Sequence, residues 1–176
     1  MTTYALSDRK FGTGGVFYGP MGCPYADLID VPTILTDLGI SAFGAADILE
    51  AFGIDQGFLA YGVVIDRLVA EGATCTIDVG WAGTTDTIEG AANADAFIDD
   101  LSINTTGRFM TTVATGSGSG AYGSDTYQGA LFETSGATMD ILFNTAATET
   151  AVFSIAIPGW QTDCKAAIKY RADNGL

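Results

Sequence analysis

A strict alternation of polar and apolar residues in one segment constrains the fold of this chain more than any other feature. Residues 74–81 alternate at a period of two, which is the pattern of a half-buried β-strand. Successive side chains of a strand point to opposite faces of its sheet. One face would therefore carry Cys75, Ile77, Val79 and Trp81, and the other Thr74, Thr76 and Asp78.

Short apolar segments recur along the rest of the chain, separated by Gly-rich or polar turns, and no helical pattern alternates with them as it would in a βαβ fold. We expect strands within 58–69, 74–81, 96–103, 107–114, 127–132, 138–143 and 151–157. The dipeptide Pro158-Gly159 is expected to end the last strand. The pattern predicts an all-β protein, an antiparallel β-sandwich of jelly-roll type.

Helical signals are few, and at most one or two short helices are expected. Residues 45–52 are the best candidate, because Gly44 precedes them and Gly53 would terminate a helix there. Residues 25–40 are expected to be extended. Residues 25–176 would form a single sandwich domain, since a chain of 176 residues suits one domain with an arm.

Residues 1–24 are predicted to form an extended N-terminal arm. The run from Phe11 to Gly22 contains five glycines and one proline, so it forms no core of its own. Its apolar side chains are nevertheless too numerous for a free linker. We expect them to dock on this subunit or, slightly favoured, on a neighbour, where they would serve assembly more than folding. The contact residues proposed in the arm are Phe11, Val16, Phe17 and Tyr18, with Tyr25 just after it.

The charge of the chain is strongly acidic, with a formal net charge of −14. Residues 11–164 contain Arg67 and Arg108 as their only bases, against 19 acids. Such a body disfavours nucleic acid and anionic membrane surfaces as partners, and no stretch is long and apolar enough for a membrane span. Self-repulsion that keeps the protein soluble is one interpretation. The other is that the basic ends of the chain dock onto something acidic.

Composition excludes several kinds of chemistry. The chain has no histidine, so it holds no Ser-His-Asp or Cys-His catalytic site. The three cysteines lack metal-ligand spacing and are expected to be free thiols. Asp99 and Asp100 would point to opposite faces of a strand, which argues against a glycosidase pair. We therefore expect no catalytic residue and no cofactor.

Acidic residues leave a calcium site open as a weaker alternative, since calcium takes several carboxylate oxygens. The candidates are Asp95, Asp99 and Asp100, or Asp86 with Glu89. The EF-hand pattern is absent, so a solvated acidic face is favoured and no metal is expected.

Aromatic residues offer one further alternative. Trp81 falls on the apolar face of its strand, which favours packing in the core or at a subunit interface. Trp160 follows a Pro-Gly turn, and Tyr122 and Tyr127 flank a Gly/Ser-rich loop. A sugar site at these three residues would suit a glycan-binding module.

The order of features between residues 58 and 157 resembles small β-sandwich structural proteins of tailed bacteriophages, including the decoration (cement) proteins of their heads. The segments that carry the resemblance are Val69–Gly72, Thr74–Gly80, Ala96–Ile98, Asn104–Gly107, Gly129–Phe132, Met139–Phe143 and Val152–Ile157. The most telling piece is Thr76-Ile-Asp-Val-Gly80. Residues 1–57 lie outside the resemblance.

The resemblance implies a non-enzymatic protein that forms homotrimers on the capsid surface. It further implies contacts with the major capsid protein, stabilisation of the head by bridging capsid subunits, and assembly in the host cytoplasm. Trp81 joins the arm residues and Tyr25 as a proposed capsid or subunit contact. The alternative is a host-glycan-binding module of a head fibre or tail. The acidic composition fits neither a nucleic-acid partner nor a membrane.

Overall fold

The computed structural model describes residues 2–5, 22–54, 58–81, 93–111, 130–132, 137–144 and 147–161. The described residues form eleven strands and one helix. In chain order these are β1 (Thr3–Ala5), β2 (Gly22–Asp30), α1 (Val31–Leu38), β3 (Asp47–Ile54), β4 (Phe58–Ala60), β5 (Val63–Val69), β6 (Thr76–Trp81), β7 (Asn93–Ser102), β8 (Gly107–Thr111), β9 (Ala130–Leu131), β10 (Ala137–Phe143) and β11 (Val152–Gln161). The helix is too short to cross a membrane, and no other described segment is a helix.

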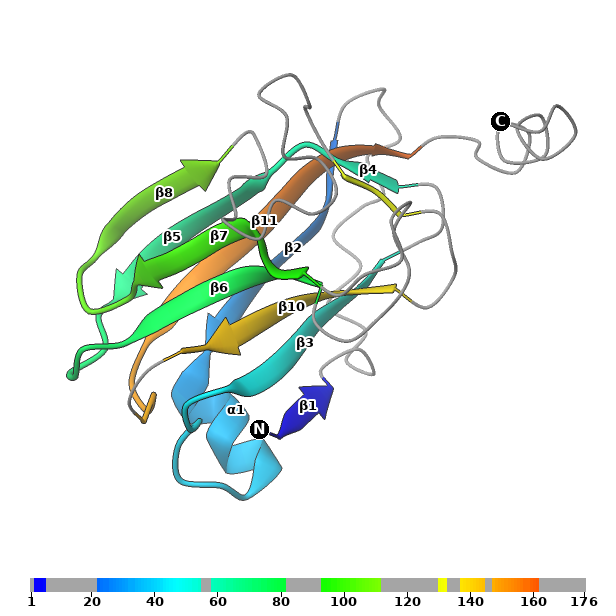
Figure 1. The fold of residues 1–176 in the computed structure, drawn as a ribbon. Coiled ribbons are helices and arrows are strands. Elements are labelled where there is room, and N and C mark those ends of the chain that lie inside the picture. Colours follow the sequence, from blue (N-terminus) through cyan, green and yellow to red (C-terminus); the bar gives the residue numbers. More distant parts are fainter. Residues whose placement is uncertain are drawn as a thin grey trace, which may run out of the picture.

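The strands form two sheets that face each other (Figure 1). Sheet A has the order β1-β3-β10-β6-β7. Sheet B has the order β8-β5-β11-β4-β9, and β2 pairs with the other side of β11. Strands β4 and β5 follow each other along the same side of β11, so they act as one interrupted strand. The predicted all-β sandwich is confirmed.

The strand pairs are nested along the sequence. The antiparallel pairs are β2 with β11, β3 with β10, β5 with β8 and β6 with β7. The four nested pairs together form one long hairpin. This hairpin is rolled up so that successive strand pairs belong to alternate sheets. It places β2, β11, β5 and β8 side by side in one sheet and β3, β10, β6 and β7 in the other, which is the strand order of a jelly roll.

The core lies between the inner faces of the two sheets. The predicted apolar face of segment 74–81 is confirmed, because Cys75, Ile77, Val79 and Trp81 are all at most 1% exposed. The Trp81 ring packs edge-on against Phe97 and Phe132, at centroid distances of 5.8 and 5.9 Å. From sheet B, alternate residues of β11 enter the same core: Phe153, Ile155 and Ile157. Full burial of each such side chain stabilises the fold by about 1.5–3 kcal/mol.

Helix α1 corrects the prediction that residues 25–40 are extended throughout. Its start has a side-chain cap, because Thr33 N donates to Asp30 Oδ1 at 3.2 Å, and Pro32 fits the first turn. Its end has a glycine cap, since Gly39 adopts φ +68° and its N–H bonds the last turn. Val31 and Ile34 are buried, so packing holds the helix on the sandwich.

Strand β3 corrects the prediction of a helix at 45–52. Ala46 adopts φ +66°, which a right-handed helix does not allow. From Asp47 the chain pairs on one side with β1 and on the other with β10. The weak helix propensity of an Ala/Leu/Glu segment is overridden by two ladders of hydrogen bonds and by burial of Leu49 and Ala51.

The end of the last strand differs from expectation. Strand β11 does not end at Pro158-Gly159 but runs to Gln161, because a register shift between Ile157 and Gly159 absorbs the proline.

The described parts of the proposed arm pair with the body. Thr3–Ala5 pairs in parallel with β3, and β2 begins at Gly22. The division into an arm of residues 1–24 and a domain of residues 25–176 stays a prediction. Residues 6–21 lie outside the described part.

Gly159 provides a test of the packing at the centre of sheet B. A Cβ at this position would lie 2.5 Å from Leu59 O and closer still to the Phe58 ring. Because the obstacle includes backbone, Gly159→Ala should lower the free energy of unfolding by about 3 kcal/mol. Gly53→Ala, in β3, is the matched control, since nothing lies within 4 Å of its added Cβ. Urea unfolding checks both variants, and equal midpoints would contradict this packing.

Candidate interaction surfaces

A β-bulge between β6 and β7 gathers three carboxylates on the outer face of sheet A. Ile77 pairs with Leu101 and Val79 with Ile98, so Asp99 and Asp100 together oppose Asp78. Asp100 has a left-handed backbone with φ +53°. The prediction that Asp99 and Asp100 point to opposite faces is therefore wrong. One carboxylate oxygen from each of the three residues lies within 4.8 Å of the others.

The three residues, called here the acidic bulge, are held by hydrogen bonds from their neighbours. Asp100 N donates to Asp78 Oδ1 at 2.7 Å, and the Asn144 amide donates to the same atom. Thr76 Oγ1 and Asn144 Nδ2 each donate to Asp100 Oδ1 at 3.0 Å. Burial raises the pKa of the Asp78 carboxyl, and the charges of Asp100 and Asp99 add to this despite the hydrogen bonds.

Carboxylate oxygens are the ligands that calcium prefers, so the acidic bulge has the donor atoms that a hard cation takes. Neighbouring donors already bond to Asp78 and Asp100, however, and Asp99 and Asp100 are exposed to solvent. We therefore infer no metal site. Of the other calcium candidates, Asp95 lies in β7 outside this cluster, and Asp86 and Glu89 lie outside the described residues.

Glu71 is a buried carboxylate that sequence reasoning interpreted only as part of a turn. Its oxygens accept hydrogen bonds from the backbone N–H groups of Glu149, Thr150 and Ala151 at 2.9–3.1 Å, and from Thr150 Oγ1 at 3.0 Å. Burial alone would raise the pKa of Glu71, but these bonds and one from Gly72 N outweigh it and hold the pKa below its ordinary value. The side chain fixes the turn that leads into β11.

The outer face of sheet B differs in character from the acidic bulge. The large apolar side chains that are exposed within the described residues all lie in this sheet: Leu28, Leu68, Val69 and Met110, at 49–61% exposure. Small side chains separate them, because Ala26 and Ala156 pair across β2 and β11. The described outer face of sheet B is thus largely apolar, a composition that interfaces use at their centres.

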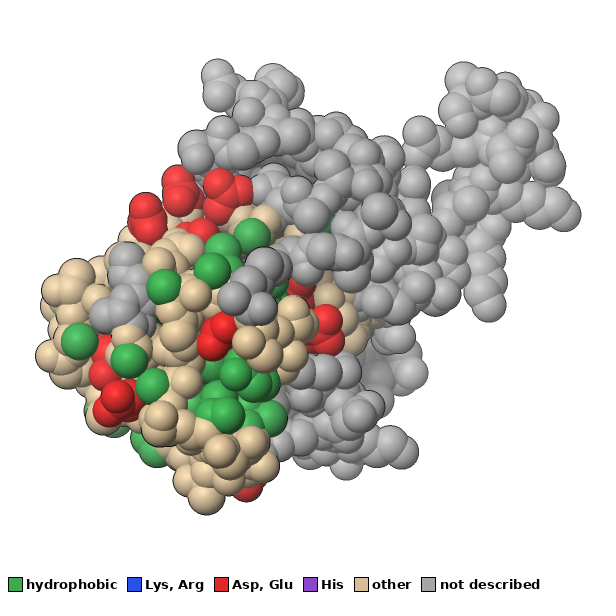
Figure 2. Space-filling model, turned by 60° about the horizontal axis from the view of Figure 1, so that its bottom comes forward, with side chains coloured by type: hydrophobic (Ala, Val, Ile, Leu, Met, Phe, Trp, Pro, Cys, Tyr) green, Lys and Arg blue, Asp and Glu red, His purple; other side chains and the backbone are tan. Residues whose placement is uncertain are grey.

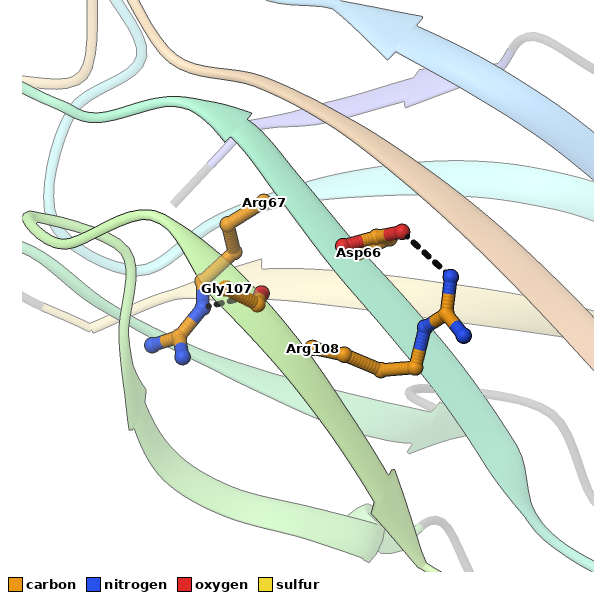
Figure 3. Close-up of polar contacts among 4 residues, drawn as sticks. All are labelled: Asp66, Arg67, Gly107 and Arg108. Carbon is orange, nitrogen blue, oxygen red and sulfur yellow. Dashed lines mark hydrogen bonds and ion pairs between the residues drawn. The ribbon is translucent and has the colours of Figure 1, made fainter.

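Arg67 and Arg108, the two bases of residues 11–164, lie where β5 and β8 pair in sheet B (Figure 3). Arg108 Nη2 donates to Asp66 Oδ2 at 2.7 Å across the two strands, and 70% of the Arg108 side chain is exposed. Arg67 turns the other way and bonds the carbonyls of Gly107 and Ser102, so it fastens the loop between β7 and β8. On the side of the molecule in Figure 2, the charged side chains of described residues are acidic.

The proposed contact residues are distributed unevenly. Trp81 lies in the core, and Tyr25 is partly buried with its ring edge-on to Phe58 at 4.9 Å. A role for either in subunit contacts stays a prediction, and Trp81 would need its own surroundings to open first. Phe11, Val16, Phe17, Tyr18, Tyr122 and Tyr127 lie outside the described residues, as does the side chain of Trp160.

Catalytic constellations do not emerge among the described side chains. Cys75 lies with its Sγ 2.6 Å from Thr148 Oγ1 and is fully buried, which suits a structural thiol. The convergence of the acidic bulge was not predicted, because a β-bulge breaks the two-residue alternation on which strand faces are assigned. The hydrogen bonds of Glu71 to residues 149–151, called here the Glu71 clamp, were not predicted either, because these partners lie nearly 80 residues away in the sequence.

Comparisons with known proteins give similarity in fold only. No protein-family model matches the sequence. No curated protein matches it either. Among solved structures, a chain of the capsid asymmetric unit of cyanophage Pam1 superposes with a TM-score of 0.56 at 13% identity, covering 85% of this chain and 90% of that one. A chain of the capsid of Ralstonia phage GP4 superposes with a TM-score of 0.51 at 16% identity, covering 92% and 100%.

The Glu71 clamp predicts a pH-dependent difference in stability. Glu71→Gln replaces a charged acceptor by an amide that turns an N–H group toward backbone donors, which should cost about 2 kcal/mol at neutral pH. A lowered folded-state pKa contributes stability above the ordinary Glu pKa of 4.5, and this contribution is lost as the pH falls through the folded value.

Urea unfolding of wild type and Glu71→Gln between pH 7 and pH 3 measures this difference, which should shrink on acidification. Asp78→Asn is the contrasting control, because its stability relative to wild type should change with pH in the opposite direction. The raised pKa of Asp78 means that its ionised form opposes folding above the ordinary value of 3.8. A Glu71→Gln deficit that stays constant with pH would contradict the role assigned to the ionised carboxylate.

Proposed function

We propose that this chain is a non-enzymatic structural component of a tailed-bacteriophage capsid. The observation that carries the proposal is the likeness of its sandwich, over 85–92% of the chain, to chains of two phage capsid structures. The matches cover 90–100% of those chains, so they are similar to this chain as wholes rather than in one shared motif.

The finer proposal is a decoration protein of jelly-roll type. In this role the chain trimerises on the outer surface of the capsid and bridges subunits of the major capsid protein, after assembly in the host cytoplasm. The largely apolar outer face of sheet B supports it, because an exposed face of this kind marks an interaction surface. A protein that binds only the assembled shell stabilises that shell by mass action.

The strongly acidic composition supports the same role. A net charge of −14 opposes non-specific association of free copies and argues against binding to the packaged nucleic acid. The glycan-binding alternative rested on Trp160, Tyr122 and Tyr127, and no described side chain favours it.

Quantitative peptide mass spectrometry of purified virions of the encoding phage tests the proposal. A decoration protein should be present in a copy number comparable to that of the major capsid protein. A handful of copies per particle would contradict decoration and favour a tail or vertex component. Complete absence from virions would overturn the capsid role itself. A non-structural protein of the same phage is the control for carry-over during purification.

A further inference from the structure

The two outer faces of the sandwich have opposite character beside the same edge. Strands β7 and β8 are the edge strands of sheet A and sheet B, and both lie on the left in Figure 1. The bonds from Arg67 to Ser102 O and Gly107 O tie their ends together. The molecule therefore presents apolar side chains with an arginine on the sheet B side of this edge, and carboxylates on the sheet A side.

On the sheet B side, the surface is formed by Leu68, Val69, Arg108 and Met110, called here the β5–β8 patch. The three apolar side chains are 49–61% exposed. Methionine and arginine beside apolar residues are typical of interface centres. In the ion pair between Arg108 and Asp66 the Arg108 side chain is 70% exposed and that of Asp66 is 30% exposed, so solvent weakens the hold on Arg108. The guanidinium remains accessible to a second carboxylate.

On the sheet A side, the surface is the acidic bulge. Asp99 and Asp100 are exposed, and Asp78 behind them is mostly buried. Asn144 and Thr76 hold the Asp100 carboxylate in place, so its charge is presented in a fixed position. The edge strand is also bulged at this point, which prevents simple strand-to-strand pairing with another sheet.

Charge favours a second copy of this chain as the occupant of the β5–β8 patch. Two bodies with the same large negative net charge repel each other unless a cation lies at the point of contact. Arg67 and Arg108 are the only bases in residues 11–164, and Arg67 is used within the fold. Among the described residues, the surface around Arg108 is therefore where the acidic bulge of another copy meets favourable charge.

We propose that copies of this chain associate head to tail, with the β5–β8 patch of one subunit against the acidic bulge of the next. Because the two surfaces are on opposite faces beside one edge, each copy contacts a different surface of its neighbour, and such a heterologous contact closes into a ring if the rotation permits. A three-membered ring rests on the proposed function, which supplies the trimer. The interface itself rests on the residues above.

Charge reversal and its rescue test the interface in the full-length protein. Sedimentation velocity over a concentration series measures the association. Arg108→Glu places like charges in contact and should weaken association about a hundredfold. Adding Asp99→Lys should recover most of this loss, because the pair is restored with reversed signs. Adding Asp37→Lys instead, on α1, gives the same net charge as the rescue variant and should not recover association.

The outcomes separate the interface from the function. A wild type that associates while Arg108→Glu associates equally well overturns this interface and leaves the capsid role intact. Rescue by Asp37→Lys as effective as rescue by Asp99→Lys also overturns it, because net charge alone would then explain the result. A wild type that is monomeric at every concentration overturns the proposed head-to-tail association, whereas the capsid role is tested separately by the mass spectrometry of virions. Met110→Ser should also weaken association, because it removes an exposed apolar side chain of the β5–β8 patch and leaves the charge unchanged. Melting curves verify that every variant is folded.

Discussion

Strand β11 is the element on which the two-sheet arrangement depends. It pairs with β2 on one side and with β4 and β5 on the other, so β2 is joined to the rest of sheet B only through it. Its alternate residues supply Phe153, Ile155 and Ile157 to the core between the sheets. Strands β2 and β11 form the outermost of the nested pairs. The jelly roll is therefore complete only when β11 pairs with β2, which lies more than 120 residues earlier in the sequence.

Contacts of this kind explain what the sequence predicted and what it did not. Alternation at 74–81 predicted the buried face of β6 because that pattern depends only on the two-residue repeat of a strand. The prediction of a helix at 45–52 was wrong because the strand character of β3 comes from its pairing with β1 and β10, which are distant in sequence. Helix α1 was missed although Asp30, Pro32 and Gly39 are recognisable local end signals.

The candidate surfaces were less predictable than the fold. The acidic residues of the bulge are evident in the sequence, but their convergence depends on a register shift opposite Asp78. The position of Arg108 beside exposed apolar residues depends on which strands become neighbours in sheet B. Glu71 lies in a turn by its local sequence, and only the return of residues 149–151 makes it a structural clamp.

The charges of the molecule connect its stability to its proposed role. The buried carboxylate of Glu71 accepts hydrogen bonds from the backbone, and its ionised form stabilises the turn before β11. Asp99 and Asp100 of the acidic bulge are instead exposed, while Asp78 behind them has a pKa raised mainly by burial, with a smaller contribution from the charges of Asp100 and Asp99. In the proposed head-to-tail contact, the exposed Asp99 and Asp100 are the complementary partners of Arg108 on the next copy.

Cryo-electron microscopy of the purified virion tests the central claim most directly. The account predicts sandwich-shaped density on the outer surface of the major capsid layer, grouped in threes and repeated over the shell. In each group, β8 of one copy should face β7 of the next. A shell whose averaged density contains no such feature, with this chain absent or confined to one vertex or the tail, would contradict the account.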